Sequence, residues 1–453
     1  MNIKSLLVAG SKMLLFVFFC LTGSLVFSQG QYVRELNSKP NEKWSTFFVH
    51  DIKGLNVAEP PGKEQTQKEL SELRQKTQPD EKALQQIRYW DAGSPAYRWN
   101  QLGYSLISFE DFQTFSRAPT AWMNIAINDA MAAAWSIKYR YMRKRPAQFD
   151  PSLKSVVEAP ATPSYPCEHT VAAAAAAGVL SYFYPSKADS MMKMAKELAQ
   201  SRIDARVQFP SDVEAGWKLG EQVAKLIIEE AKKDGSDKPW AGKMNTDPKR
   251  WTGEYPVGIA TATFKPIVLK SGNQFRPAAP PDFSKDMQEL KDFKQNFESA
   301  SLAYYWAART GFDVWTELAN QKIFEYHLDK NTPACVAIYT LLHVAIHDAA
   351  IAIMDAKYAY WGIRPFQLDT TFHPLIFTPP FPGYPSGHAT ASSVAATVLQ
   401  YFFPGDVALF QKTAQECADS RFYAGIHFRT DNETGLEFGR KIGNYIIDNW
   451  TKR

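Results

Sequence analysis

Three short segments between residues 357 and 431 decide how this chain is interpreted: Lys357-Tyr-Ala-Tyr-Trp-Gly-Ile-Arg364-Pro365, then Tyr384-Pro385-Ser386-Gly387-His388, and then Ser420-Arg421 with His427 and Asp431 beyond it. Together they supply three cations, two imidazoles and a glycine at which a backbone N–H can approach a ligand closely. A guanidinium binds tetrahedral oxyanions through paired hydrogen bonds, and free N–H groups at a helix start add to them. The sequence therefore predicts one site for a multiply charged oxyanion such as phosphate or vanadate.

The residue types of this site recur 219 positions earlier in the chain. The matching pairs are Lys138/Lys357, Arg145/Arg364, His169/His388, Arg202/Arg421 and Asp212/Asp431. One constant offset without a gap over this length indicates two copies of one module.

Both copies have the pattern of a helical bundle. An apolar helix ends at Arg-Pro, because proline disfavours helix at the residue before it. A Pro-rich loop, an Ala-rich helix and a last helix follow, and we expect that last helix to open with a capping box, Ser211-x-x-Glu214 or Thr430-x-x-Glu433. Alternating strand patterns are scarce. We therefore predict an all-α fold of two helical bundles from an internal duplication, with an intact site in the C-terminal bundle only.

The chain divides into five predicted segments. Residues 1–28 resemble a signal peptide, since Lys4 and Lys12 precede an apolar run and Val26-Phe27-Ser28 resembles a cleavage site. We expect an N-terminal arm over 29–95, a degenerate copy over 96–233, an ordered crossover over 234–300 and the catalytic copy over 301–453. The mature chain is expected to be exported, periplasmic or secreted, and no later run is expected to span a bilayer.

The composition gives weaker constraints. A length of 453 residues favours two domains or one duplicated domain. A net charge of +4 argues neither for nucleic acid nor for a polybasic membrane surface. Without Cys20 of the signal segment, Cys167, Cys335 and Cys417 form an odd set, so the fold is not expected to depend on a disulfide. Nothing in the sequence fixes the oligomeric state.

Each cationic motif has a simpler alternative. Lys357 and Arg364 are two helical turns apart and share a side of a helix, which by itself suits a solvated basic face. Their apolar neighbours instead favour a partly buried pair that needs an anion. Ser386-Gly387-His388 precedes a helix and by itself suits a capping turn, but Gly387 permits close backbone approach and His388 is placed to exchange a proton with a bound oxygen.

His427 and Asp431 are the most informative pair. Asp431 can accept from one ring nitrogen and so present the other to a ligand, although a purely structural His–Asp pair is the alternative. In the first copy Gln208 stands in place of His427, and Glu168 in place of Gly387. We expect Glu168 to neutralise the cations retained there and to leave a structural relic. Asp129 and Asp348 occur in both copies, and we expect an architectural role for them.

The three motifs together resemble the signature of vanadium-dependent haloperoxidases and type 2 phosphatidic acid phosphatases. The doubled length and the Phe381-Pro-x-Tyr-Pro-Ser-Gly-His stretch favour the haloperoxidase branch. That resemblance implies a vanadate cofactor with His427 as its metal ligand, Lys357, Arg364, Arg421, Ser386 and the Gly387 N–H on its oxygens, and His388 as acid–base. It also implies hydrogen peroxide and a halide as partners, with Lys357 polarising the peroxide. Phe381 matches chloroperoxidases but Met354 departs from the fungal enzymes, so the halide stays open.

Two other functions remain open at this point. One is a periplasmic acid phosphatase without a cofactor, in which His427 would form a phosphohistidine and His388 would protonate the leaving group of a phosphate ester. The 39 residues between His388 and His427 fit compact phosphatases at least as well. The other is a non-catalytic oxyanion-binding module.

Overall fold

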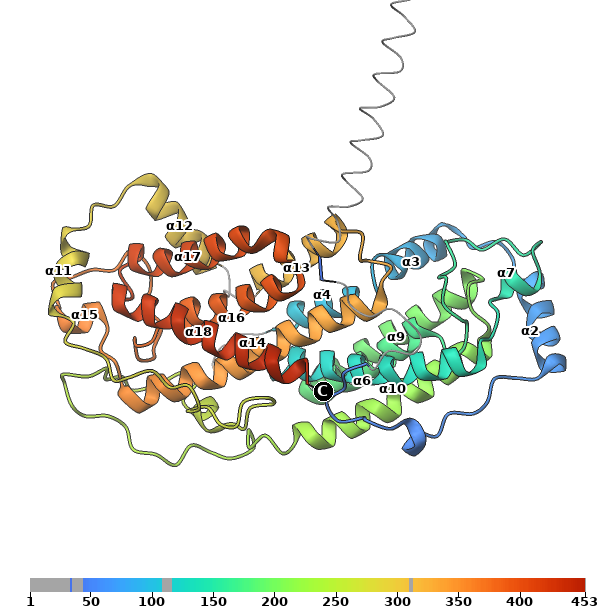
Figure 1. The fold of residues 1–453 in the computed structure, drawn as a ribbon, viewed down its shortest axis with the longest axis horizontal. Coiled ribbons are helices and arrows are strands. Elements are labelled where there is room, and N and C mark those ends of the chain that lie inside the picture. Colours follow the sequence, from blue (N-terminus) through green and yellow to red (C-terminus); the bar gives the residue numbers. More distant parts are fainter. Residues whose placement is uncertain (1–32, 35–43, 108–115, 309–312, 453) are drawn as a thin grey trace, which may run out of the picture.

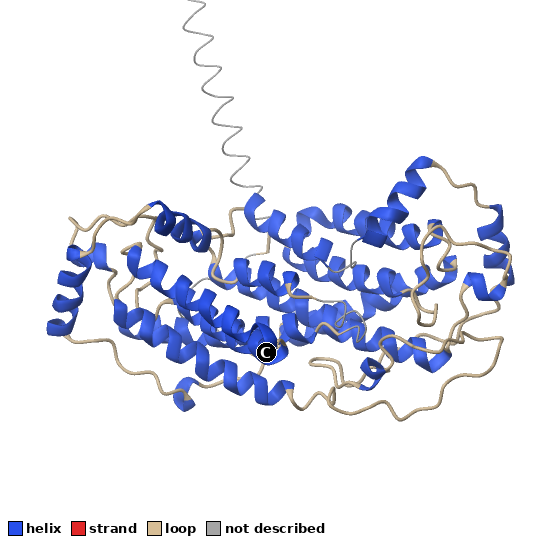
Figure 2. Cartoon of the chain, turned by 180° about the vertical axis from the view of Figure 1, so that it is seen from behind, coloured by secondary structure: helices blue, strands red, loops and turns tan. Residues whose placement is uncertain are grey.

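The computed structural model describes residues 33–34, 44–107, 116–308 and 313–452, and the predicted signal peptide lies outside them. Within these residues every regular element is a helix (Figure 2). The predicted all-α class is therefore confirmed.

The first half contains these elements: η1 (Ile52–Gly54), α2 (Lys63–Gln75), α3 (Glu81–Asp91), α4 (Tyr97–Ser105), α6 (Ala118–Tyr141), α7 (Pro146–Phe149), α8 (Glu168–Phe183), η2 (Pro185–Lys187), α9 (Ala188–Asp204) and α10 (Pro210–Ala231). The second half contains η3 (Ala260–Thr263), α11 (Ser284–Asp292), α12 (Phe297–Ala308), α13 (Asp313–Glu325), α14 (Thr332–Tyr360), α15 (Pro365–Leu368), α16 (Gly387–Phe402), η4 (Pro404–Asp406), α17 (Val407–Tyr423) and α18 (Arg429–Trp450).

The two halves form two bundles side by side (Figure 1). Helices α6, α8, α9 and α10 make up one bundle, and α14, α16, α17 and α18 make up the other. The long helices α6 and α14 pack on each other at the centre of the molecule. Helices α2 and α11 lie at its opposite ends.

The corresponding helices keep the offset of 219 residues at their ends. Helix α6 ends at Tyr141 and α14 at Tyr360, and each is capped by a left-handed residue, Met142 or Trp361. The Pro of each Arg-Pro pair then starts a short helix, α7 or α15. Proline has no N–H to donate and suits this first position, so it begins the short helix. The long helix has already ended at the left-handed residue, and the expectation that it ends at Arg-Pro is wrong by a few residues.

Glycines on the last helix allow the close approach that builds the site. A Cβ on Gly439 would lie 2.4 Å from the Thr390 carbonyl oxygen, and one on Gly435 would lie 2.8 Å from that of Ser386. Any side chain at either position would push α18 away from α16. The contact holds the start of α18 against the start of α16, and the Ser386 N–H donates to the Asp431 carbonyl at 3.0 Å.

Helices α10 and α18 do begin with capping boxes, but the residues predicted to form them are wrong. The N-cap positions are Phe209 and Phe428, and the residue that bonds back to the N-cap N–H is an aspartate, Asp212 at 3.0 Å or Asp431 at 3.1 Å. Asp431 therefore serves two purposes, since the same carboxylate oxygen caps α18 and accepts from His427.

The arm and the crossover make matching contacts with the two bundles. Asp129 accepts from the backbone N–H groups of Phe47, Phe48 and Val49, at 2.7 to 3.2 Å. Asp348 accepts from three consecutive N–H groups of residues 267–269, at 2.7 to 2.8 Å. These bonds fit the architectural role expected for both aspartates. They also show that the repeat of contacts extends into the predicted arm and crossover.

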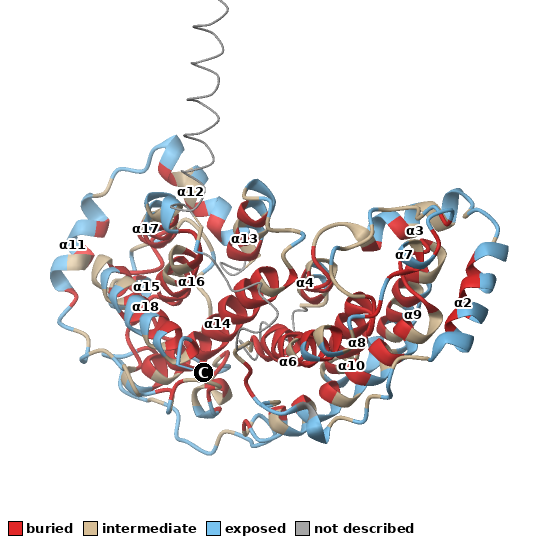
Figure 3. Cartoon of the chain, turned by 45° about the vertical axis from the view of Figure 1, so that its right-hand side comes forward, coloured by how far each residue is buried: buried red, intermediate tan, exposed pale blue. Residues whose placement is uncertain are grey.

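One stretch among the described residues, 332–368, is long and apolar enough to pass for a membrane span. A helix that forms the core of a protein can have the same length and composition, so the expectation that no later run spans a bilayer stays a prediction. The apolar window lies wholly inside the protein, where α14 forms the core between the two bundles (Figure 3). Cys167, Cys335 and Cys417 are all buried free thiols.

Candidate functional site

The structure gathers the predicted site residues in the second bundle. Lys357 lies in the last turn of α14, Arg364 immediately precedes α15, and Ser386 caps α16. Arg421 lies in the last turn of α17, and Asp431 in the first turn of α18, just after His427. All six residues are at most 3% exposed, and His388 is half-buried.

Lys357 is held by two carbonyl groups. Its Nζ donates to the carbonyl oxygens of Pro382 and Gly383, both at 2.7 Å. An ammonium has three donors, and no third acceptor lies within hydrogen-bond range of it among the described residues. Burial lowers the pKa of Lys357 well below its ordinary value, Arg364 lowers it further, and Asp431 opposes both.

Arg364 is also only partly satisfied. Its Nε donates to the Phe381 carbonyl at 3.1 Å, and its Nη1 donates to the Ile426 carbonyl at 2.6 Å. Nη1 also lies 3.0 Å from Nε2 of His427, whereas Nη2 is buried without a partner in the described part of the chain. Burial lowers the pKa of Arg364 to about 10.

His427 connects this arginine to Asp431. Its Nδ1 lies 2.9 Å from Oδ2 of Asp431, and its Nε2 faces a guanidinium that can only donate. The ring therefore carries its proton on Nδ1 and a lone pair on Nε2. Burial, and then the charge of Arg364, lower the pKa of His427 well below its ordinary value, and burial raises that of Asp431 to about 7. The imidazole is thus neutral and its Nε2 is nucleophilic.

Arg421 and His388 complete the site with contacts from α12. Arg421 donates from Nε to the Ser420 hydroxyl and from Nη2 to the Ala303 carbonyl, both at 3.0 Å, and it has no carboxylate partner within the described residues. The backbone of Trp306 bonds to His388, while Nε2 of His388 has no partner in that same part of the chain. Burial, and then Arg421, lower the pKa of His388 well below its ordinary value.

The first bundle has the same cationic side chains, and each of them pairs with a carboxylate. Lys138 donates to the carbonyls of Pro163 and Ser164, as Lys357 does to Pro382 and Gly383, and it also pairs with Glu168 at 2.7 Å. Arg145 Nη2 pairs with Glu168 at 2.9 Å. The predicted neutralisation by Glu168 therefore holds for two cations. It fails for Arg202, which pairs instead with Asp91 of α3 at 2.6 Å.

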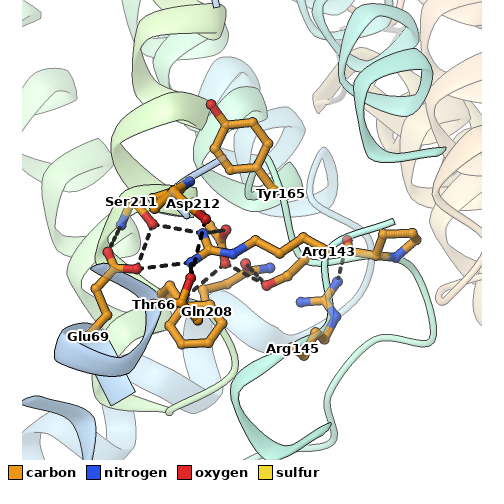
Figure 4. Close-up of polar contacts among 12 residues, drawn as sticks. Thr66, Glu69, Arg143, Arg145, Tyr165, Gln208, Ser211 and Asp212 are labelled. Carbon is orange, nitrogen blue, oxygen red and sulfur yellow. Dashed lines mark hydrogen bonds and ion pairs between the residues drawn. The ribbon is translucent and has the colours of Figure 1, made fainter. Parts of the chain in front are cut away.

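Gln208 makes contacts that match those of His427, but its amide has no ring nitrogen that could bond to a metal or phosphorus atom. With its amide oriented to satisfy both ends, it donates to Asp212 at 3.0 Å and accepts from Arg145 at 2.5 Å. Asp212 has a further ion pair with Arg143 at 2.6 Å, and Arg143 also contacts Glu69 and Ser211 (Figure 4). Every charge in this first site thus has a partner inside the protein.

Sequence reasoning missed the residues that reach the two sites from outside the copies. Asp91 and Glu69 come from the arm, and Asp286 of α11 accepts from the Thr430 N–H at 2.9 Å. No local pattern identifies these carboxylates. The sequence gives only indirect evidence for them: a buried arginine requires a partner of opposite charge, which implies a carboxylate but does not identify it.

The residues of the second site fit an oxyanion such as vanadate. Arg364 Nη2 and His388 Nε2 are polar nitrogens without partners in the described residues, and Lys357 has a donor to spare. Two buried cations, Lys357 and Arg364, face one carboxylate, that of Asp431, and the buried Arg421 has no carboxylate partner among the described residues. An anion would supply both the missing charge and the missing acceptors. The described residues contain no group of three His, Cys, Asp or Glu that could chelate a bare cation.

Comparison with known proteins agrees with this geometry. Residues 120–233 match the PAP2 superfamily, and residues 406–453 match the VCPO second helical-bundle domain. A search of functionally curated proteins gives no match.

Two solved structures that this chain resembles are bacterial vanadium-dependent peroxidases. The first bacterial vanadium-dependent iodoperoxidase superposes with a TM-score of 0.57 at 22% identity, over 86% of this chain and 98% of that one. A holo-type bacterial vanadium-dependent chloroperoxidase superposes with a TM-score of 0.56 at 15% identity, over 78% and 97% of the two chains. These findings confirm the resemblance that the motifs carry: this chain has the fold of the vanadium-dependent haloperoxidases and, in its two halves, sequence matches to the PAP2 superfamily and to the VCPO second helical-bundle domain.

Proposed function

We propose that this protein is an exported vanadium-dependent haloperoxidase that oxidises a halide with hydrogen peroxide. One observation carries the proposal. Lys138, Arg145 and Arg202 in the first half are paired with carboxylates, while the corresponding Lys357, Arg364 and Arg421 have no carboxylate partner within the part of the chain that the structure describes. The second bundle is therefore arranged for an anion from outside the protein.

Each residue of the site has a separate task in this proposal. Lys357, Arg364 and Arg421 would hold the vanadate oxygens, with Ser386 and the Gly387 N–H at the start of α16. His427 would ligate vanadium through Nε2, and Asp431 keeps that nitrogen unprotonated by accepting from Nδ1. Bound there, vanadium supplies Lewis-acid chemistry without a change of oxidation state.

His388 is the proton-transfer group. Burial, which holds the pKa of His388 well below its ordinary value, favours a neutral ring, and Nε2 has no hydrogen-bond partner among the described residues. A neutral imidazole at this position could take a proton from hydrogen peroxide as general base. The nearby Arg421 and Lys357 charges then favour release of that proton again.

Two assays on one preparation test the proposal. Halide-dependent oxidation of a phenol dye by hydrogen peroxide is measured with and without orthovanadate, and hydrolysis of p-nitrophenyl phosphate is measured without it. We expect dye oxidation only with vanadate and halide together. Iodide, bromide and chloride are compared in parallel, since the site residues do not fix the halide.

Phosphate-ester hydrolysis is the second candidate, favoured by the 39-residue spacing of His388 and His427. The neutral Nε2 of His427 would attack phosphorus, and the same cations would bind the transferring group. Phosphatase turnover without vanadate-dependent oxidation would establish this candidate and reject the first. Anion binding with neither activity would leave a binding module.

A further inference from the structure

Two tyrosines of α12 are exposed next to a residue that contacts the anion site. Tyr304 is 54% exposed and Tyr305 is 47% exposed. The residue before them, Ala303, accepts from Arg421 Nη2 at 3.0 Å through its backbone carbonyl. Since consecutive Cα atoms are only about 3.8 Å apart, both phenols belong to the turn of α12 that touches the site.

The residue after the two tyrosines contacts the part of the site that solvent reaches. His388 is half-buried, whereas the six other site residues described above are at most 3% exposed. The backbone of Trp306 bonds to His388, so α12 lies against this exposed side. We therefore expect a small product that forms at the anion site to leave past His388 and alongside α12.

The first bundle has a matching tyrosine on α3. In each bundle the last arginine of the site donates from Nη2 to a backbone carbonyl at 3.0 Å, that of Ile87 on α3 or of Ala303 on α12. Counted from these carbonyls, Tyr89 corresponds to Tyr305, 216 positions later. Each is followed by a buried tryptophan whose ring stands edge-on to it, with ring centroids 4.8 or 5.5 Å apart. Tyr89 is 40% exposed, so the two phenols are alike in setting and exposure.

The two tyrosines differ in the site beside them. Helix α3 packs on α9 and α12 packs on α17, so Tyr89 and Tyr305 lie over different bundles (Figure 1). Beside Tyr89 the three cations have carboxylate partners, and Gln208 stands in place of His427. The proposed function therefore places the oxidation of halide to hypohalous acid beside Tyr305 only.

We propose that Tyr304 and Tyr305 are modification sites, whose phenol rings the protein halogenates with its own hypohalous acid. The ring carbon next to the phenol hydroxyl is electron-rich and forms a bond to the halogen, while the halogen–oxygen bond breaks. The same carbon loses its proton to the displaced hydroxide, which leaves as water, so the step needs no further oxidant. This inference rests on the proposed function, because hypohalous acid has to form first.

Peptide mass spectrometry after turnover tests it. The full chain is incubated with orthovanadate, hydrogen peroxide and the halide that the dye assay supports, without dye. Excess free methionine is present to consume acid that has left the protein. A second sample, without peroxide, receives hypohalous acid from outside. Halogenation of Tyr305 relative to Tyr89 is compared between the two samples, since Arg98 lies 4.3 Å from the centroid of the Tyr89 ring and makes the two rings unequal at the outset.

We expect this ratio to be several-fold higher in the sample that turns over. A double variant, Tyr304→Phe with Tyr305→Phe, should oxidise dye as the wild type does and should give no halogenated peptide from α12. Equal ratios in the two samples, with dye oxidation intact, would overturn the inference and leave the proposed function standing. A wild-type chain that oxidises no halide would overturn both.

Discussion

Arg364 Nη1 lies 3.0 Å from His427 Nε2, so a guanidinium donates to the nitrogen that would bond to a metal or phosphorus atom. Arg364 therefore lies in the direction from which the central atom of an anion would approach His427 Nε2. Its other terminal nitrogen, Nη2, is buried without a partner in the described residues. Binding of an anion would require the Arg364 guanidinium to give up its hydrogen bond to His427 Nε2 and to donate to oxygens of the anion instead.

His427→Gln should abolish activity while keeping the fold. Gln208 shows that an amide at this position can bridge the aspartate and the arginine, at 3.0 and 2.5 Å. An amide has no ring nitrogen to bond to vanadium or phosphorus, so kcat should fall by on the order of 10³-fold or more. The unfolding temperature should stay within a few degrees. Gln208→Ala is the control and should keep both activities, and a Gln208→Ala variant as inactive as His427→Gln would contradict the assignment.

Gly387→Glu should close the second site in the way Glu168 closes the first. The new carboxylate would stand in the first turn of α16, where it is favoured by the helix dipole, and would pair with Lys357 and Arg364. We expect loss of vanadate binding together with a higher unfolding temperature of the anion-free protein. Calorimetry and thermal unfolding measure the two effects. Retained vanadate affinity would show that the anion binds elsewhere.

Glu168→Gln should strongly destabilise the first bundle. It removes the shared partner of Lys138 and Arg145, which are buried. Breaking one side of a buried ion pair costs about 3 to 5 kcal/mol. The free energy of unfolding, measured with denaturant, should fall by this order. Added phosphate should restore little of it, and full recovery by phosphate would instead reveal a latent anion site in this half.

Asp431→Asn should remove a specific pH dependence of stability. Burial raises the pKa of Asp431 from 3.8 to about 7, so between these values the native protein binds more protons than the unfolded chain. The contribution of this group to the free energy of unfolding therefore falls as the pH rises through that window and is level above it. Asp431→Asn also removes the charge that opposes the lowered pKa of Lys357, so the difference between the two proteins reports Asp431 together with Lys357.

We expect the wild-type protein to lose stability relative to Asp431→Asn as the pH rises from about 4 to about 7. Denaturant titrations across this range measure the difference. A stability difference that does not change with pH would mean that Asp431 is ionised throughout. Catalytic activity should fall in the same variant because the tautomer of His427 is no longer fixed.

Asp348→Asn should loosen the crossover. The carboxylate accepts from three consecutive backbone N–H groups at 2.7 to 2.8 Å, and a single amide oxygen cannot replace both carboxylate oxygens. Loss of charge-assisted bonds of this kind should cost about 2 to 4 kcal/mol of unfolding free energy. Asp129→Asn is the matched change in the first half. If Asp348→Asn leaves stability unchanged, the aspartate has another role.

The sequence by itself determined the helical class, the 219-residue correspondence and the residue types of the site. These are local properties, because proline disfavours helix at the residue before it and a histidine four residues before an aspartate is placed to meet it. Even so, the capping residue of α18 was missed, since Asp431 rather than Glu433 bonds back to the helix start.

Only the tertiary structure decided how the charges are balanced. The cation Arg202 is neutralised by Asp91 of α3, whereas its counterpart Arg421, among the described residues, donates only to the carbonyl of Ala303 and the hydroxyl of Ser420. Which buried cation keeps a carboxylate depends on segments far away in the chain. This pairing depends on packing and burial, which residue spacing does not encode. For that reason the cations of the first half have carboxylate partners, whereas those of the second half have none among the described residues.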